Sequence, residues 1–281
     1  MPEKTSLISN INYLKDFYNN IYEDLRLNEV HFISLAARNK YLNEDERFSH
    51  KLGKTQMLYK TVLKRYDFTK FLSKIEQINA SADYYLTLNI VYMPKKCCVI
   101  YANINPSDTI KATADFKKIL AEYDAELFNI SLNTEDKSRF ENAMLRYNNL
   151  HNNLMTCYQN NRSRKLWSDI DIDCEEKIKE ETLQQFIKDL NVNAENAKII
   201  LVRTHGGFHF LMRIRDMDKE YNPGKVQEKL VQKFGDICKE IVINKNEMIP
   251  IPGTFQALFP VTMSIYNKNG EIRKEDSYLY G

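Results

Sequence analysis

The stretch LWSDIDID, residues 166–173, alternates acidic and apolar side chains, and it points to the fold class of the chain. On a strand, Trp167, Asp169, Asp171 and Asp173 share one face. Neighbouring carboxylates repel one another, and burying an unpaired carboxylate is costly. A divalent cation removes both problems, because Mg²⁺ and Mn²⁺ take hard oxygen ligands. The alternative is a half-exposed strand with solvated acids, although aspartate is poorly suited to strands.

The segments on either side of this strand predict a mixture of helices and hairpins, which is an α+β fold. Apolar periodicity predicts helices over residues 7–27, 57–78 (one or two helices), 109–123, 136–160, 175–190 and 223–240. Runs rich in β-branched and aromatic residues predict strands over 30–36, 84–93, 97–104, 166–173, 198–203 and 208–213. Asp108 is expected to cap the helix that begins at Thr109.

The bulk composition indicates an ordinary globular protein with few extremes. The chain has 281 residues, of which 43% are hydrophobic and 28% charged, and its net charge of +2 excludes a strongly basic nucleic-acid coat protein. Five cysteines without a CxxC pair predict free thiols in a reducing compartment. With no apolar run near the ~20 residues of a membrane span and no signal-peptide core, we expect a cytoplasmic protein that does not contact membranes.

A second motif, RTHGGFHFLMRI, spans residues 203–214. The Gly206-Gly207 pair permits a tight turn, and a triphosphate can lie against exposed backbone amides at such a turn. His209 then begins a strand and can donate a hydrogen bond to a phosphate oxygen. The alternative is a plain hairpin with a structural histidine.

A third motif, MIPIPGTFQ, spans residues 248–256. Two prolines stiffen it, and Gly253 lets the backbone turn. We expect this segment to wall a nucleotide pocket, although an ordinary loop would explain the same residues.

These three motifs, in this order, resemble the archaeo-eukaryotic primase superfamily, and more narrowly the primase-polymerases of phages and plasmids. The resemblance covers roughly residue 84 to the C-terminus, and it includes YANINPSD (residues 101–108) followed by a helix. It implies a two-module catalytic core with an RRM-like antiparallel sheet over residues 81–281. Residues 1–80 would then be a mostly helical N-terminal region, unless residues 1–281 form one continuous domain.

The resemblance also implies the chemistry. The family makes primers or extends DNA or RNA from nucleoside triphosphates on a single-stranded DNA template, with two divalent ions, Mg²⁺ or Mn²⁺. Asp169 and Asp171 match its metal-binding pair, and Asp173 is the reserve if the register slips by two. His209 matches the histidine that contacts the phosphates of the incoming nucleotide, and Thr204 and Gly207 match its turn. The chain has no GxxxxGK[ST] loop, so we expect a separate helicase. The Asn- and Lys-rich composition suits a phage or mobile element, in which case the compartment is the host cytoplasm.

The chain departs from the family pattern at the third acid. The matching position is Asn244, whose amide oxygen can ligate a metal but brings no charge. Asp236, Glu240 or Glu247 is a candidate substitute. The alternative is a catalytically inactive primase-like module that binds nucleic acid or a replication partner. A replication-initiator nuclease is a third reading, but the chain lacks the His-hydrophobic-His pair that it requires.

Cations are also needed to contact phosphates. We expect Arg38 and Lys40 to face the triphosphate. Two further patches are candidates for template contact, and solvated helix faces would explain them equally well. They comprise Lys51, Lys54, Lys60, Lys64 and Arg65, and separately Arg162, Arg164 and Lys165.

Overall fold

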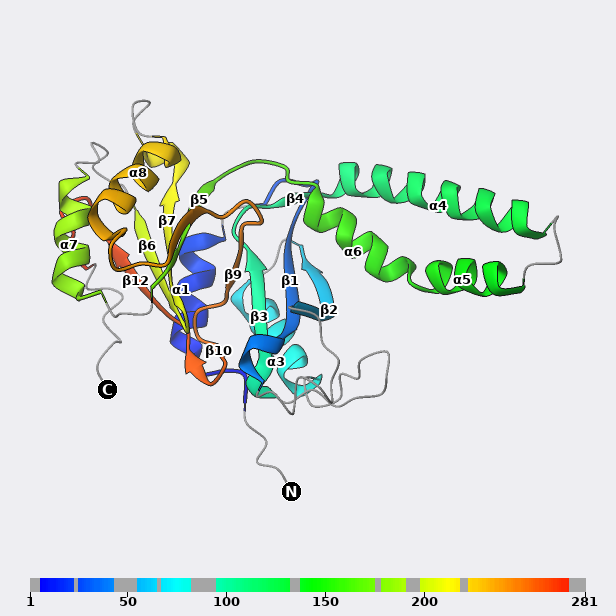
Figure 1. The fold of residues 1–281 in the computed structure, drawn as a ribbon, viewed down its shortest axis with the longest axis horizontal. Coiled ribbons are helices and arrows are strands. Elements are labelled where there is room, and N and C mark those ends of the chain that lie inside the picture. Colours follow the sequence, from blue (N-terminus) through cyan, green and yellow to red (C-terminus); the bar gives the residue numbers. More distant parts are fainter. Residues whose placement is uncertain are drawn as a thin grey trace, which may run out of the picture.

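The computed structural model describes residues 6–22, 25–42, 55–64, 67–81, 95–131, 137–174, 178–190, 198–217 and 222–272. Over these ranges the chain is an α+β protein in which helices pack on antiparallel sheets, as expected (Figure 1). None of the helices in these ranges is long and apolar enough to cross a lipid bilayer.

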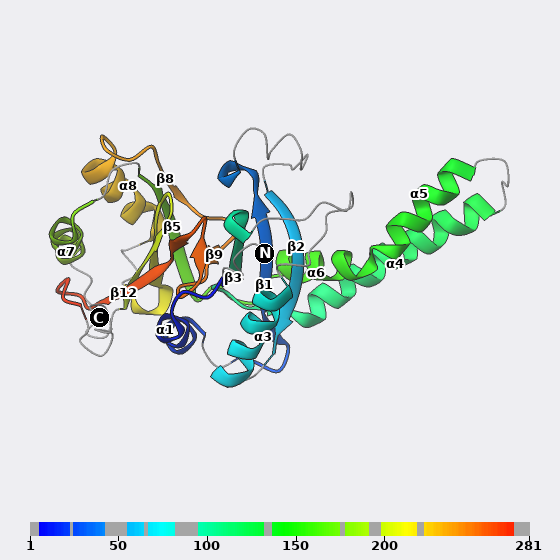
Figure 2. The same ribbon diagram turned by 90° about the horizontal axis from the view of Figure 1, so that it is seen from below.

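The first sheet takes strands from both sides of residue 80. Its order is β2-β1-β3-β9 with every neighbouring pair antiparallel, and the short β4 pairs with the start of β1. The strands are β1 (Glu29–Arg38), β2 (Thr55–Leu63), β3 (Cys98–Asn103), β4 (Ser107–Asp108) and β9 (Met248–Pro250). Two helices, α1 (Ile11–Ile21) and α3 (Phe68–Ser81), pack side by side against it (Figure 2).

The second sheet contains the acidic strand. Its order is β12-β6-β7-β5-β8, again antiparallel throughout. The strands are β5 (Trp167–Asp173), β6 (Ile199–Thr204), β7 (Gly207–Arg213), β8 (Glu240–Ile243) and β12 (Thr262–Tyr266). Helices α7 (Glu180–Asp189) and α8 (Pro223–Phe234) cover one face, where they pack on Ile170 and Ile172 (Figure 1). The acids of β5 alternate with these isoleucines and therefore lie on the opposite face, toward the first sheet.

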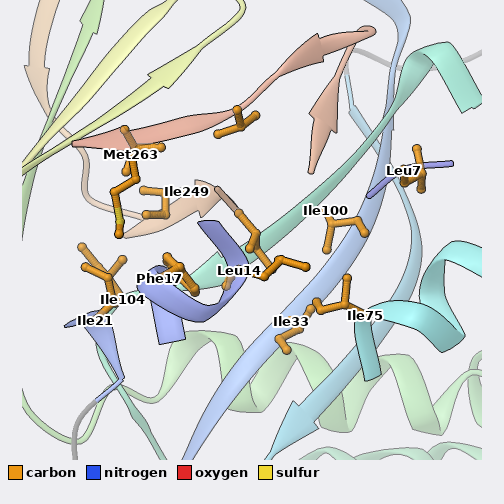
Figure 3. Close-up of a cluster of buried hydrophobic side chains, with 14 of the residues drawn as sticks. Leu7, Leu14, Phe17, Ile21, Ile33, Ile75, Ile100, Ile104, Ile249 and Met263 are labelled. Atoms are coloured by element: carbon orange, nitrogen blue, oxygen red, sulfur yellow. The ribbon is translucent and has the colours of Figure 1, made fainter. Parts of the chain in front are cut away.

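Helix α1 packs between the two sheets. Its Leu14, Phe17 and Ile21 recur at helical spacing, and they pack with Ile249 of the first sheet and Met263 of the second (Figure 3). This core fills one end of the space between the sheets. A hairpin of β10 (Phe255–Gln256) and β11 (Phe259–Pro260) lies nearby, against β3.

A helical arm projects from the first sheet (Figures 1 and 2). It consists of α4 (Thr109–Ser131), α5 (Lys137–Asn148) and α6 (Leu150–Asn160), which pack on one another. The carboxylate of Asp108 accepts hydrogen bonds from the backbone of Ile110 and Lys111, so the predicted cap is confirmed.

Several predicted elements differ from the structure; the helix predicted over 223–240, for example, ends at Phe234, and Glu240 begins strand β8. Residues 57–63 are predicted as helix but lie in strand β2, because antiparallel pairing with β1 runs along this segment and satisfies the backbone groups on that side. The helix predicted over 136–160 is interrupted at Asn149, whose backbone leaves the helical region. The first helix is shorter than 7–27 and begins after Asn10, whose side chain accepts a hydrogen bond from Asn12. The strand predicted over 84–93 lies outside the described residues.

The prediction of free thiols is wrong for one pair of cysteines. Cys174 follows the end of β5, and Cys238 precedes β8, its antiparallel neighbour. This pairing brings the two Cα atoms to 4.3 Å, and the thiols form a disulfide. The remaining cysteines, Cys97, Cys98 and Cys157, are buried and take no part in this disulfide.

Candidate functional site

A cleft of about 460 Å³ opens between the two sheets, at the end that the core around α1 does not fill. The second sheet contributes acidic and turn residues to its lining, and the first sheet contributes cations and an aromatic residue. The lining includes Asp171, Asp173, Thr204, Gly206, His209, Glu240 and Asn244 from the second sheet and its loops, and Arg38, Lys40, Thr55, Met57, Tyr101, Met248 and Pro250 from the first. Most of the residues expected to form a site are therefore brought together here.

The three acids of β5 have different environments. Asp169 is almost fully buried and does not line the cleft, whereas the side chain of Asp171 is 48% exposed and Asp173 lies at the exposed end of the strand. Burial raises the pKa of Asp171, and the charges of Asp169, Asp173 and Glu240 raise it further. The accessible acids of the cleft are thus Asp171 and Asp173, with Glu240 opposite Asp173 on β8.

Asp169 supports the site from behind. Both of its carboxylate oxygens lie 3.1 Å from Nδ1 of His209, and one accepts a hydrogen bond of 2.7 Å from the amide of Asn244. Burial lowers the pKa of His209, but the charges of Asp169 and Asp171 outweigh it, so the pKa is raised. The ion pair fixes the orientation of the imidazole and favours its charged form.

Asn244 occupies the position of the third acid, and its amide is engaged within the protein. Its Nδ2 donates to Asp169, and its Oδ1 accepts from the backbone of Asn246 at 3.1 Å. The backbone N–H of Asn244 also donates to the carbonyl of Asp169. In this arrangement the amide of Asn244 satisfies one oxygen of the buried Asp169 carboxylate, while the residue also borders the cleft.

Of the substitutes considered for the third acid, only Glu240 lines the cleft. Glu247 is buried, accepts a hydrogen bond from Asn105 and forms ion pairs with Arg162 and Lys165, which links the first sheet to the start of β5. Asp236 lies in the loop before β8 and is exposed.

The glycine turn sits directly beside the acids. A Cβ at Gly207 would lie 1.9 Å from the carbonyl oxygen of Ile172, and one at Gly206 would lie 3.1 Å from a carboxylate oxygen of Asp173. Only glycine lets the turn approach β5 this closely. Gly206 and Thr204 line the cleft, while Gly207 permits the close backbone approach.

The opposite wall carries the cations. Arg38 ends β1 and donates a hydrogen bond of 2.8 Å to the hydroxyl of Tyr101, and both line the cleft. Burial lowers the pKa of Lys40, and so does the neighbouring charge of Arg38. The sequence did not identify Tyr101 as a site residue, although it lies within the YANINPSD motif. Tyr101 and Arg38 are 63 residues apart, and no pattern in the sequence indicates their contact.

The third motif, residues 248–256, was expected to wall a nucleotide pocket, and only part of it borders the cleft. Pro250 and Gln256 line the cleft, but Gly253 packs against α1, with a φ of +87° and an added Cβ at 2.3 Å from the carbonyl of Asn10. Its carbonyl accepts from the backbone of Ser9 and Asn10. The segment therefore anchors α1 as well as bordering the cleft.

The second cationic patch comprises Arg162, Arg164 and Lys165, and its arginines form ion pairs within the protein. Arg164 forms an ion pair of 2.9 Å with the buried Glu29, and Arg162 pairs with Glu247 at 2.6 Å. Of the first patch, Lys60 and Lys64 are described. Lys60 donates to Thr156 of the arm, and Lys64 lines a separate cavity of about 330 Å³. Lys51, Lys54 and Arg65 lie outside the described residues.

Comparisons with protein-family models, curated proteins and solved structures found no match to this chain.

Proposed function

We propose that this chain is a template-directed nucleotidyltransferase, a DNA primase or primase-polymerase that adds nucleotides from triphosphates to a nucleic-acid strand. One observation carries the proposal: a single cleft has Asp171 and Asp173 on one wall and Arg38 and Lys40 on the other. Catalysis of this kind is positioning and charge stabilisation, which requires cations around a triphosphate and carboxylates near the reacting oxygens.

The architecture supports the same reading. The resemblance implies a two-module catalytic core that contains an RRM-like antiparallel sheet. The described residues form two five-stranded antiparallel sheets, and the cleft lies between them. The three motifs, far apart in sequence, each contribute to its lining through Asp171, Gly206 or Pro250.

The carboxylates of the cleft suit a metal ion that binds together with a substrate phosphate better than they suit a metal ion held by protein side chains alone. Among the described residues, no group of three or more His, Cys, Asp or Glu side chains is positioned to hold a metal ion. Mg²⁺ is usually bound by one or two carboxylates and completes its shell with water and substrate phosphates. Asp171 and Asp173 supply two carboxylates in the open part of the cleft. Bound divalent ions, Mg²⁺ or Mn²⁺, would activate the attacking hydroxyl and offset the charge of the leaving pyrophosphate.

His209, Arg38 and Lys40 act on the triphosphate directly. Asp169 occupies Nδ1 of His209, which leaves Nε2 to donate to a phosphate oxygen in the cleft. Arg38 and Lys40 place positive charge on the facing wall. Asp169 acts as a positioning residue in this scheme, and Asp171 and Asp173 are the acids that reach the substrate.

The test is incorporation of labelled nucleotides on single-stranded DNA with Mg²⁺ or Mn²⁺, with and without a primer. We expect the double variant Asp171→Asn/Asp173→Asn to lose incorporation to the detection limit. Its stability at neutral pH should not fall, because the variant removes repulsion that raises the pKa of Asp171. Asp236→Asn is the matched control, since that exposed acid lies outside the cleft lining. Equal activity in the double variant and the wild type would refute the proposal.

A second candidate function is a catalytically inactive module that binds nucleic acid. It is favoured by Asn244, whose amide is held by Asp169 and Asn246 where the family pattern has an acid. Under this reading the folded wild-type protein binds single-stranded DNA but incorporates nothing under any metal condition. Incorporation by the wild type excludes it.

A further inference from the structure

The hairpin of β10 and β11 has an unusual turn. Phe255 pairs with Pro260 and Gln256 with Phe259, which leaves Ala257 and Leu258 as a two-residue loop. Their φ angles are +53° and +64°, so both lie in the left-handed region. Two-residue loops of this kind normally use Asn-Gly, because a Cβ is unfavourable in that region. A leucine is nevertheless held there, and the residue is 56% exposed.

An aromatic row lies behind this loop. The ring of His205 is 6.3 Å from that of Phe259 and 5.2 Å from that of Tyr41, edge to face in both contacts. His205 is exposed, and Tyr41 and Phe259 are partly exposed. The row therefore joins three segments: the β10–β11 hairpin, the β6–β7 turn and the 3₁₀ turn (Asn39–Tyr41) that follows β1.

One buried side chain holds these segments together and connects them to the cleft. Gln256 is 5% exposed; its Oε1 accepts from the backbone of His205 at 3.1 Å, and its Nε2 donates to the hydroxyl of Tyr41 at 2.8 Å. Gln256 also lines the cleft. The aromatic row is thus fixed at the border of the proposed site (β10 in Figure 1).

Positive charge lies at the same border. Nζ of Lys40 is 5.2 Å from the centre of the Tyr41 ring, and both Lys40 and Arg38 line the cleft. Aromatic faces beside cations are the features with which proteins bind single-stranded nucleic acid, because bases stack on the rings while phosphates meet the charges. A peptide with an apolar side chain would not need the cations.

We propose that Leu258, Phe259, His205 and Tyr41 form a stacking surface for bases of a single-stranded nucleic acid that enters the cleft. Leu258 and the exposed His205 ring contact the bases, and Lys40 beside the Tyr41 ring receives an adjoining phosphate, which leaves Arg38 beside Tyr101 for the triphosphate. The proposal deepens the proposed function by placing its nucleic-acid strand, but the binding itself requires neither metal nor triphosphate.

The test is a fluorescence-anisotropy titration with a labelled oligothymidylate, without metal or triphosphate, and with an oligonucleotide of the same length whose central bases are removed. We expect Leu258→Gly and His205→Ala each to weaken binding of the intact strand roughly tenfold, the range of one lost stacking contact. His205→Phe should restore most of it. Binding of the abasic strand should change little in any variant, and the salt dependence should stay the same, because the phosphate contacts remain.

Folding is controlled within the same set. Glycine relieves the left-handed conformation at residue 258, so Leu258→Gly should melt no lower than the wild type although it binds more weakly. Leu27→Gly makes the same change at another exposed turn and should bind as the wild type does. Wild-type affinity in both Leu258→Gly and His205→Ala, equal losses on intact and abasic strands, or no binding by the wild type would each overturn the stacking surface.

The outcome is separable from that of the proposed function. If base-dependent binding is seen but the wild type incorporates nothing, the stacking surface stands and the polymerase proposal fails. Incorporation that depends on Asp171 and Asp173, with stacking variants that bind normally, gives the reverse result.

Discussion

Each of the two sheets buries a histidine, and the two histidines differ in charge because their neighbours differ. The ring of His31 in β1 stacks on that of Tyr22, with 3.6 Å between the ring centroids, and Nδ1 of His31 contacts the neutral amide of Asn103. Burial lowers the pKa of His31 to about 4. His209 of β7 contacts the carboxylate of Asp169, and its pKa is raised. The first sheet thus uses buried polar groups to complete its core, whereas the second uses them to hold charge beside the cleft.

The same contrast holds for the acids. In the first sheet, the buried Glu29 accepts from Ser163, Arg164 and the backbone of Arg26, so it is satisfied within the protein. In the second sheet, Asp171 and Asp173 face the cleft beside one another. A substitution should therefore cost stability where the polar group is satisfied, and activity where it is left open.

The largest effect on stability is expected at Asn105, which joins the two sheets. Its Oδ1 accepts from the backbone of Leu166 and Trp167, and its Nδ2 donates to the Trp167 carbonyl and to Glu247. Asn105→Ala leaves several of these buried groups without a partner and should cost about 4 kcal/mol in the free energy of unfolding. Urea titration measures this, with the exposed Asn12→Ala as control. A loss below about 1 kcal/mol would contradict the assigned role.

The sequence predicted the second sheet better than the first, for a physical reason. Alternation along residues 166–173 reports a two-sided strand directly, and the glycines beside His209 mark the turn that it needs. The segment over 57–63 has no such alternation, and pairing with β1 decided its conformation. Local pattern was enough for β1, which is buried along almost its whole length, but not for the edge strand β2, whose conformation depends on its partner.

The sequence predicted several residues of the candidate site, but it did not predict which of them are buried and which are accessible. The sequence placed Asp169 and Asp171 together, but it did not indicate that Asp169 is covered by His209 and Asn244 while Asp173 lies open. Tyr101 and Gln256 come from distant segments, and only the packing of the two sheets brings them to the cleft. Burial of this kind depends on long-range contacts, which spacing does not report.

An intermediate effect is expected from the disulfide, which is confined to the second sheet. Cys174 and Cys238 close a loop of 64 residues and tie the end of β5 to the start of β8, next to Asp173 and Glu240. Reduction should lower the free energy of unfolding by about 3 kcal/mol. The measurement compares urea titrations with and without reductant. The variant Cys174→Ser/Cys238→Ser should match the reduced wild type and be insensitive to reductant, and any remaining sensitivity would point to a different cysteine pair.

The smallest effect is expected from pH acting on His31, and it tests the comparison itself. Because the pKa of His31 is about 4 in the folded protein and near 6.5 when unfolded, the unfolded chain binds more protons between these values, so stability falls as the pH decreases through this window. We expect this shift of His31 alone to lower the free energy of unfolding by about 2 kcal/mol between pH 7 and pH 5.

The matched variant for this prediction is His31→Phe. It keeps a ring against Tyr22 and removes Nε2, which is buried with no hydrogen-bond partner among the described residues. Free energies of unfolding from urea titrations at both pH values should differ by about 2 kcal/mol less in the variant than in the wild type. An equal pH dependence in the two proteins would mean that His31 is not the neutral histidine of the pair. The contrast between the two sheets would then have to rest on their acids alone.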